Sequence, residues 1–447
     1  MNEDRQGPAP EVPETARQGA ETQRLEQPDL RWVEAGVWTE RMVLALVNGV
    51  KGGMWYSLMD KVYAPKSLAL AWKKVEANRG AAGVDGQSIE RFAARTEDYL
   101  AEFGRDLRTG EYRPQAVRRV EIPKGDGTTR PLGIPAVKDR IVQTAVKAVI
   151  EPIFEVRFHP SSYGFRPGRS CKDALREVAQ LIENGHRYAV DAGIKGYFDS
   201  IPHEKLMERV ETQIADGRIL DLLRGWLKQD IMNGMEQWTP TEGTPQGGVI
   251  SPLLANVYLH PLDERMASHG YRMVRYADDF VVMCRTREEA EAALAHIRAW
   301  VEDNGLTLHP DKTRIGNCWK KGEGFDFLGY SFGGKRRHVR KKSLDRLKDK
   351  IREKTKRTRG DSLERVISDL NPVLRGWFNY FKHAHHPVFK RLDGLIRRRL
   401  RAFLRKQEKR PGFGRCLADQ MRWTNAFFAD AGLFALHTAW QDARRPR

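Results

Sequence analysis

The stretch that decides the fold reads Met273-Val274-Arg275-Tyr276-Ala277-Asp278-Asp279-Phe280-Val281-Val282-Met283, two adjacent aspartates between two short apolar runs. Apolar runs on either side of a polar turn predict a β-hairpin with Asp278 and Asp279 at its tip. Aspartate also favours turns for its own sake, but turn preference alone explains poorly why two stand between Val and Met runs. Two carboxylates at one tip are the hard oxygen ligands that Mg²⁺ takes, so we expect a magnesium site here.

Helices and strands alternate irregularly around this hairpin. The apolar spacing predicts helices over Trp38–Leu46, Leu68–Val75, Asp139–Phe154, Pro252–Leu262 and Glu288–Asn304. Strands are expected at Arg118–Pro123, Arg130–Ile134, Arg187–Phe198 and Phe325–Tyr330, the first two joined at Gly125-Asp126-Gly127. Because no regular βαβ order appears, the pattern favours an α+β fold over a doubly wound sheet. Beyond residue 335, the spacing of Leu344, Leu347 and Ile351 predicts an all-helical segment.

Composition narrows the class of protein. The chain has 447 residues, 40% of them hydrophobic, with no apolar stretch near the roughly 18 residues that a membrane span needs. We expect no membrane partner. Residues 1–35 begin with a Glu-, Gln- and Pro-rich run that lacks the apolar core of a secretory signal, so we expect a disordered leader and a cytoplasmic location. The four cysteines form no C-x-x-C pair and are expected to be reduced thiols.

The positive charge of the chain is concentrated in one segment. Residues 335–410 hold 27 Lys and Arg against 8 Asp and Glu, whereas the net charge of the whole chain is +18. This segment therefore carries the entire excess. A solvated basic face is the simpler explanation of such a run, but clustered cations also neutralise phosphates and release counterions, and we expect nucleic-acid binding there.

Eight sequence blocks occur in a familiar order. They are Gly80-Ala81-Ala82-Gly83-Val84-Asp85-Gly86, Ile122-Pro123-Lys124 with Arg130-Pro131-Leu132-Gly133-Ile134-Pro135, Ser162-Tyr163-Gly164-Phe165-Arg166-Pro167-Gly168, Ile194-Lys195-Gly196-Tyr197-Phe198-Asp199, Gly243-Thr244-Pro245-Gln246-Gly247-Gly248, Tyr276-Ala277-Asp278-Asp279, His309-Pro310-Asp311-Lys312-Thr313 and Phe327-Leu328-Gly329-Tyr330. This order resembles group II intron-encoded reverse transcriptases. Residues 370–381 also look like the maturase, or thumb, domain of that family.

The resemblance implies a right-hand polymerase with fingers, palm and thumb. It would divide the chain into fingers with an N-terminal extension (36–185), palm (186–334), thumb or maturase domain (335–410) and a small DNA-binding appendage (411–447). The last segment is too short, and has too few cysteines, for the metal-bound endonuclease domain of some family members. The family copies RNA into DNA and assists splicing and mobility of its parent intron.

The partners implied are group II intron RNA, target DNA, an RNA–DNA hybrid and deoxynucleoside triphosphates, in a bacterial cytosol or nucleoid. Two Mg²⁺ ions would activate the 3′-hydroxyl and steady the leaving pyrophosphate.

The resemblance also implies roles for individual residues. Asp278 and Asp279 would hold the metal, with Lys312 near the pyrophosphate as a possible proton donor. The nucleotide would meet Lys124, Arg130, Ile194, Phe198 and Gln246. Among these, Phe198 would exclude a ribose 2′-hydroxyl, although an aromatic residue in a strand is more often only core. Nucleic acid would meet Arg336, Arg337, Lys341, Lys342, Arg375, Arg397, Arg398 and Arg399.

One position departs from the family pattern. An aspartate normally precedes the Ile-Lys-Gly-Tyr-Phe-Asp run, and here Gly193 stands in its place. Asp191 lies two residues upstream, about 6.5 Å along an extended strand, too far to join the same metal cage. We therefore expect a polymerase that is impaired as written. A splicing cofactor that only binds RNA is one alternative, and a reverse transcriptase of defence or diversity-generating type is another.

Overall fold

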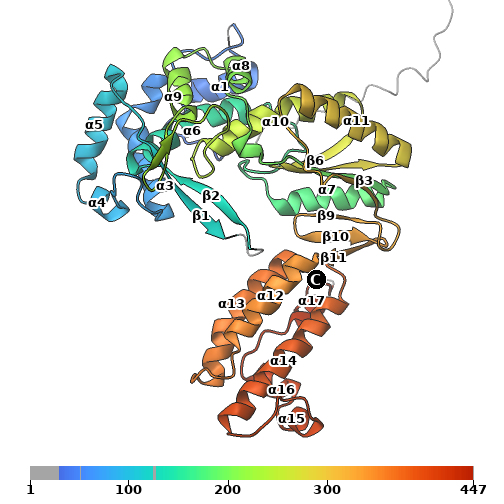
Figure 1. Cartoon of the computed structure of the whole chain (residues 1–447). Helices are drawn as coiled ribbons and strands as arrows, with labels where there is room; N and C mark the ends of the chain where they lie inside the picture. The colour runs from blue at the N-terminus through green and yellow to red at the C-terminus, as the bar shows by residue number, and fades with distance from the viewer. Residues whose placement is uncertain (1–29, 51, 124–126, 446–447) are drawn as a thin grey trace, which may run out of the picture.

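The computed structural model describes residues 30–50, 52–123 and 127–445. These residues form three lobes: fingers and palm side by side, and a helical thumb below them (Figure 1). The fold is α+β, as the sequence predicts. Residues 1–29 of the expected leader, Lys124, and Gly125 and Asp126 of the expected turn lie outside the described residues.

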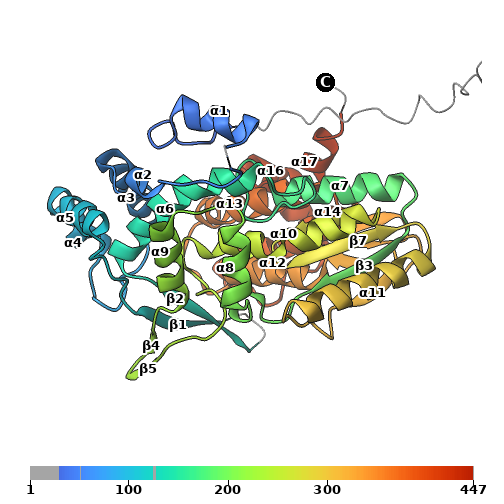
Figure 2. The same cartoon turned by 90° about the horizontal axis from the view of Figure 1, so that it is seen from above.

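The palm is built on an antiparallel sheet of strand order β6-β7-β3-β8. Its strands are β3 (Tyr188–Gly193), β6 (Arg272–Tyr276), β7 (Asp279–Cys284) and β8 (Arg314–Asn317). Its helices are α7 (Cys171–Glu183), α10 (Ser251–Ser268) and α11 (Arg287–Asp303), of which α7 and α11 cover opposite faces of the sheet (Figure 2). The predicted hairpin is therefore confirmed as β6–β7, with Tyr276 paired to Asp279.

Both faces of the palm sheet are buried, because alternate side chains of each strand enter different cores. Phe280 and Val282 of β7 join the core shared with the fingers. Val281 and Met283, one residue out of phase, join the core shared with α7 and the thumb. This period of two is what a strand imposes on its side chains, and it anchors both strands of the hairpin in two different cores.

The fingers surround a buried central helix, α6 (Val137–Glu155). The other fingers helices are α1 (Glu40–Asn48), α2 (Met59–Val62), α3 (Pro65–Asn78), α4 (Ile89–Ala93) and α5 (Thr96–Thr109). A four-stranded sheet contains β1 (Val117–Pro123), β2 (Thr129–Ile134), β4 (Ile231–Asn233) and β5 (Glu236–Trp238). Helices α8 (His203–Glu211) and α9 (Gly217–Leu227) carry the chain from the palm back to β4. The predicted fingers hairpin is confirmed, with Ile122 opposite Arg130.

The first turn of α6 contains a fully buried carboxyl. Asp139 accepts hydrogen bonds from the Tyr112 hydroxyl at 2.6 Å, the Gln115 amide at 3.0 Å and the Gln229 side chain at 3.2 Å. Burial raises the pKa of Asp139 to about 6. Because its folded pKa lies above its unfolded value, the proton stabilises the folded state, and this contribution is lost as the pH rises through 6.

We therefore expect the unfolding free energy of the native protein, relative to Asp139→Asn, to fall by about 2 kcal/mol between pH 4.5 and 7. Asparagine does not titrate, so the difference isolates the carboxyl. Urea denaturation of both proteins at several pH values measures it. A difference that stays constant with pH would show that Asp139 does not titrate in this range.

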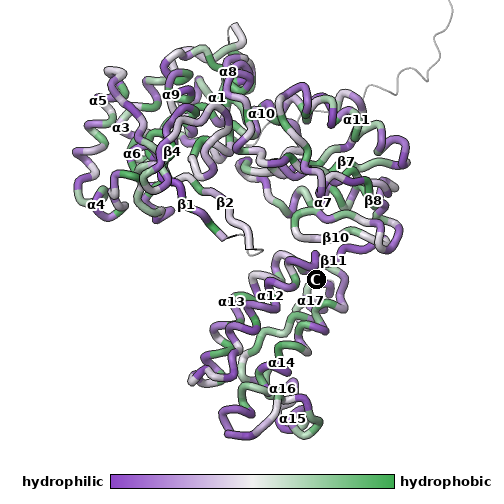
Figure 3. The backbone as a smooth tube through the Cα atoms, viewed as in Figure 1, coloured by the Kyte–Doolittle hydropathy of each residue, from purple (hydrophilic) through white to green (hydrophobic). Residues whose placement is uncertain are grey.

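The thumb begins beyond a three-stranded sheet formed by β9 (Phe325–Phe327), β10 (Tyr330–Gly333) and β11 (Arg336–Val339). Its long helices are α12 (Lys341–Lys354), α13 (Leu363–Phe381) and α14 (Pro387–Gln407). Hydrophobic and hydrophilic stretches alternate along α13 and α14 (Figure 3), as expected of helices with one buried face.

Three short helices follow α14: α15 (Leu417–Arg422), α16 (Asn425–Asp430) and α17 (Leu436–Asp442). Trp423, Phe428 and Leu436 are buried in the same core as α13 and α14. The Asp393 carboxylate of α14 accepts the first amides of α17, from Leu436 and His437, both at 2.9 Å. The segment 411–447, expected as a small appendage, thus shares the core of the thumb over its described residues, and its binding to DNA stays a prediction.

Two strands, predicted over Arg187–Phe198 and Phe325–Tyr330, end earlier in the structure than the sequence predicts. Strand β3 stops at Gly193, and Tyr197–Asp199 forms a 3₁₀ turn after Gly196, whose φ of 57° breaks the extended backbone. Strand β9 stops at Phe327, where Leu328 and Gly329 both have positive φ and turn the chain into β10. Propensity for strand therefore overestimated both elements. In the described part of the chain, no helix combines the length and apolarity that crossing a bilayer requires.

Candidate active site

The two aspartates stand at a tight two-residue turn. Ala277 and Asp278 connect β6 to β7, and Ala277 has a φ of 58°, a left-handed conformation that is costly for a residue with a Cβ. Asp278 is half-buried and Asp279 is exposed. Such a turn keeps its shape only when the surrounding structure holds it.

Arg275, the second-last residue of β6, holds this turn in its shape. Its guanidinium is fully buried and donates to both carboxylate oxygens of Asp263, at 2.7 and 2.5 Å. It also donates to Asn256 Oδ1 at 2.9 Å and Ser162 Oγ at 2.8 Å. A fifth hydrogen bond, of 3.0 Å, reaches the carbonyl of Ala277 itself. The buried arginine thus ties the strained turn to helix α10.

The block at 162–168 packs directly against the same turn. A Cβ on Gly164 would lie 2.2 Å from the backbone nitrogen of Ala277, closer than side chains tolerate, so glycine is required there. The backbone of Arg275 also exchanges hydrogen bonds of 2.9 Å with Ser161 and Tyr163. The sequence suggested no role for Arg275, Asp263 or Gly164 in holding the tip; a charged residue inside an apolar strand was the available signal.

Gly193 lies directly opposite Asp279, at the end of β3. A Cβ placed on Gly193 would be 3.2 Å from Asp279 Oδ1 and 3.7 Å from the Asp278 carbonyl oxygen. A side chain at this position would therefore project into the space beside both aspartates. The structure places the departure from the family pattern at the tip, as expected; its effect on activity stays a prediction.

Asp191 does not replace the absent carboxylate. Its side chain pairs with Arg314 of the neighbouring strand β8 at 3.5 Å. Burial raises the pKa of Asp191 to about 6, an effect that the charge of Arg314 partly offsets. The Asp191 carboxylate is thus paired with Arg314, two residues along β3 from the position opposite Asp279.

Cationic side chains act on the aspartates from two directions. The pKa of Asp278 is raised first by burial and next by the charge of Asp279, while Lys312 and Arg130 oppose both. Lys312 lies near Gly193 because His309 donates its amide to the Gly193 carbonyl at 2.8 Å. Arg130, on strand β2 of the fingers, lies close enough for its charge to act on Asp278. Both predicted residues are thus brought to the aspartates.

Two predicted nucleotide-binding residues that follow Gly193, Ile194 and Phe198, differ in burial. The Ile194 side chain is only 3% exposed and lies in the core, so any contact with a nucleotide would use its main chain. Phe198 is half-buried on the 3₁₀ turn, with its ring edge-on to Phe165 at 6.1 Å between centroids. Its role as a sugar gate stays a prediction.

The turn at 243–248 lies against the fingers sheet. The Gly133 amide donates to the Gln246 carbonyl at 2.6 Å, and a Cβ on Gly247 would lie 2.2 Å from the Gly133 carbonyl oxygen. A side chain at position 247 would therefore collide with strand β2.

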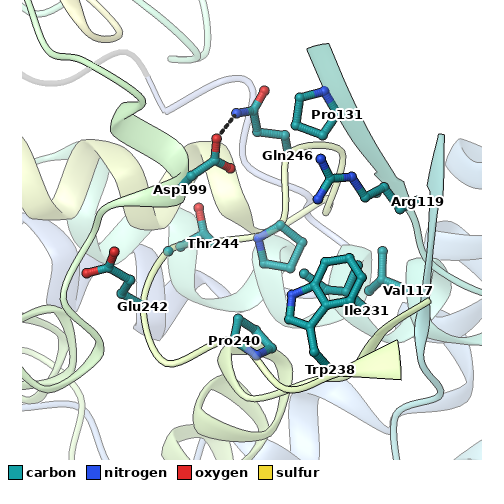
Figure 4. A pocket seen from close by; sticks show the side chains of 13 residues that line it. Val117, Arg119, Pro131, Asp199, Ile231, Trp238, Pro240, Glu242, Thr244 and Gln246 are labelled. Carbon is teal, nitrogen blue, oxygen red and sulfur yellow. Dashed lines mark hydrogen bonds between the residues drawn. The ribbon is translucent and has the colours of Figure 1, made fainter. Parts of the chain in front are cut away.

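The Gln246 side chain donates to Asp199 at 2.9 Å, at one wall of a cavity of about 320 Å³ (Figure 4). Arg119 and Trp238 line another wall, the guanidinium 5.6 Å from the ring centroid. Asp199, which the sequence did not single out, is thus the partner of a predicted nucleotide-binding residue.

Most of the predicted nucleic-acid-binding cations are exposed on the thumb. Arg336, Lys341, Lys342, Arg375 and Arg398 are exposed, and Arg337, Arg397 and Arg399 are half-buried. Arg399 is already occupied, since it donates to the Thr355 hydroxyl at 2.6 Å and to two carbonyls at the end of α12. It therefore joins two thumb helices.

The side chains at the hairpin tip supply some, but not all, of the ligands that a divalent cation needs. Asp278 and Asp279 present hard oxygen ligands, and their mutual repulsion in a half-buried position favours a bound cation. Across the described residues, however, no three His, Cys, Asp or Glu side chains gather as a metal cluster. The arrangement offers ligands for Mg²⁺ but lacks the third carboxylate at position 193.

A paired-aspartate hairpin in a palm, flanked by fingers and a helical thumb, defines a right-hand nucleic-acid polymerase. The family model for reverse transcriptase (RNA-dependent DNA polymerase) matches residues 122–332. The model for the group II intron, maturase-specific domain matches residues 344–422.

Named relatives agree with these matches. Protein YkfC of Escherichia coli is 36% identical over 62% of this chain and 83% of its own length. The group II intron-encoded protein LtrA of Lactococcus lactis is 37% identical over 45% of this chain and 33% of its own length. A 91 kDa protein in the cob intron of Schizosaccharomyces pombe is 28% identical, over 71% of this chain and 49% of that protein. The chain thus spans half or less of the last two.

This chain belongs to the group II intron-encoded reverse transcriptases, which join a reverse transcriptase domain to a maturase domain. By family it is an RNA-directed DNA polymerase and an RNA-binding protein, and the family generally uses Mg²⁺.

Proposed function

We propose that this chain binds group II intron RNA, assists its splicing, and copies RNA into DNA from a primer at the DNA target. The observation that carries the proposal is the catalytic hairpin and the maturase domain in one chain, joined through the β9–β11 sheet. The maturase domain also argues against reverse transcriptases of the defence or diversity-generating type. We place its action in the bacterial cytosol or nucleoid, where intron RNA and target DNA meet.

The chain's own residues suit the polymerase step. Asp278 and Asp279 would hold Mg²⁺, which when bound lowers the pKa of the primer 3′-hydroxyl and stabilises charge on the leaving pyrophosphate. Arg130 would offset triphosphate charge and Lys312 would give a proton to pyrophosphate, a proposal supported by the charge of both residues acting on Asp278. The half-buried Phe198 ring would favour deoxynucleotides over ribonucleotides.

A second function is favoured by one specific observation, the glycine beside the aspartates. With Gly193 in place, the protein would act mainly as a splicing cofactor that holds intron RNA. The two functions separate experimentally because splicing assistance uses RNA binding and leaves the hairpin tip unused.

We expect the protein to raise the splicing rate of its cognate intron RNA at low Mg²⁺, and Asp278→Asn to raise it equally. RNA folding is the step assisted, so loss of a metal ligand should not matter. Gel analysis of precursor and excised intron with and without protein measures this. Absence of stimulation by either protein would refute the maturase assignment.

A further inference from the structure

A basic groove lies along helix α7, away from the hairpin tip. It encloses about 390 Å³ between α7 on one side and β10, β11 and the end of α13 on the other. A smaller cavity of about 140 Å³ continues it, since Arg337 lines both. Its lining contains neither Asp278 nor Asp279, and Tyr380 is the lining residue that lies near Tyr276. We call it the α7 groove.

Cations from three elements converge on this groove. Lys172 and Arg176 come from α7, Arg337 from β11 and Lys382 from the residue after α13. Among the side chains that the structure describes, Lys172, Arg337 and Lys382 form no ion pair. Glu183 is the one carboxylate in the lining. Arg176 pairs with Asp173 at 2.8 Å, so the net positive charge of the groove is carried mainly by the other three cations.

The positive charge of the groove affects the pKa of His383, which also lines it. Its pKa is lowered first by burial and then by the charges of Arg337, Lys382, Arg444 and Arg176. Four cations close enough to act on one imidazole repel one another, which costs stability unless an anion is present. Such an arrangement favours an anionic ligand.

The groove offers charge and few free polar groups that could recognise a base. The Tyr330 hydroxyl donates to the Tyr380 carbonyl at 2.6 Å, and the Tyr380 hydroxyl donates to the Leu328 carbonyl at 2.7 Å. Both tyrosines are therefore engaged within the protein. Contacts made by lysine and arginine alone position a phosphate backbone without reading its sequence.

An aromatic surface adjoins the groove at the thumb. Trp440 of α17 lies against His386, with ring centroids 5.1 Å apart, and the Arg444 guanidinium lies 4.5 Å from the Trp440 centroid. Arg444 is also one of the four cations acting on His383. The half-buried Trp440 ring, with the exposed His386 ring and a cation beside it, is the kind of surface on which an unpaired base can stack.

We propose that the α7 groove binds the phosphate backbone of RNA at a site separate from the polymerase cleft. One wall comes from the reverse transcriptase domain and the other from the maturase domain, so a bound RNA strand would bridge the two. The inference rests on the proposed function, because it takes RNA to be the polyanion that this protein meets. An acidic peptide is the competing occupant.

The test uses the full chain with its polymerase cleft already filled by an RNA–DNA primer–template. Binding of a labelled RNA stem-loop to this complex is followed by fluorescence anisotropy over a range of salt concentrations. The variant Lys172→Ala/Arg176→Ala/Lys382→Ala should weaken stem-loop binding on the order of tenfold or more and lower the salt slope by about 2. Primer–template affinity should stay unchanged.

The matched control is Lys73→Ala/Arg105→Ala/Arg298→Ala, which removes the same charge from exposed positions on α3, α5 and α11. It should leave stem-loop binding at the native level. Equal losses in both triple variants, or none in the first, would overturn the proposal, as would polyglutamate displacing the RNA at equal charge concentration. Failure to bind primer–template at all would instead contradict the proposed function.

Discussion

Primer extension by Gly193→Asp should exceed that of the native chain by about 100-fold or more. A third carboxylate would complete the metal cage, and metal ions contribute several kcal/mol of transition-state stabilisation, with about 1.4 kcal/mol for each factor of ten. The site is ready to accept it. Gly193 pairs with Asp279, and a Cβ there meets Asp279 Oδ1 at 3.2 Å, a contact that this exposed side chain can relieve by a small shift.

The control for this prediction is Gly193→Asn, which has nearly the same shape and carries no charge. It should leave extension at the native level, because an amide is a poor substitute for a carboxylate at a divalent cation. The measurement is single-turnover extension of a DNA primer on an RNA template across a Mg²⁺ titration. Equally robust extension by the native chain and Gly193→Asp would show that the two aspartates suffice.

Asp263→Ala should lower the free energy of unfolding by about 3–5 kcal/mol. It removes the bidentate partner of Arg275 and leaves a buried guanidinium without a counter-charge, the costliest way to break a buried ion pair. Urea denaturation followed by circular dichroism measures the change. The matched control is Glu291→Ala, which breaks the exposed pair with Arg287 and should have no measurable effect.

The double variant Arg275→Met/Asp263→Leu separates stability from positioning. Replacing both charges with apolar groups should recover much of the lost stability. Extension in the Gly193→Asp background should nevertheless stay low, because the bond from Arg275 to the Ala277 carbonyl is gone. If the double variant regains full activity, Arg275 does not position the hairpin tip.

The catalytic hairpin could be predicted from sequence because its determinants are local. The short apolar runs on either side of Asp278 and Asp279 mark the two strands, and the turn between them fixes the register. Helix α6 was equally accessible, since its apolar positions repeat along one continuous segment. The ends of β3 and β9 could not be predicted from sequence, because positive φ angles at Gly196, Leu328 and Gly329 depend on packing more than on propensity.

Sequence by itself determined the class of the protein, the position of the paired aspartates and the absence of a third carboxylate at Gly193. Only the tertiary structure decided what holds the tip in place. Arg275, Asp263 and Gly164 are far apart in the chain, and their contacts exist only after α10 and the 162–168 segment pack against β6. The α7 groove has the same origin, since its cations come from segments that folding brings together. Electrostatic and steric effects act through space, whereas sequence patterns record only neighbours along the chain.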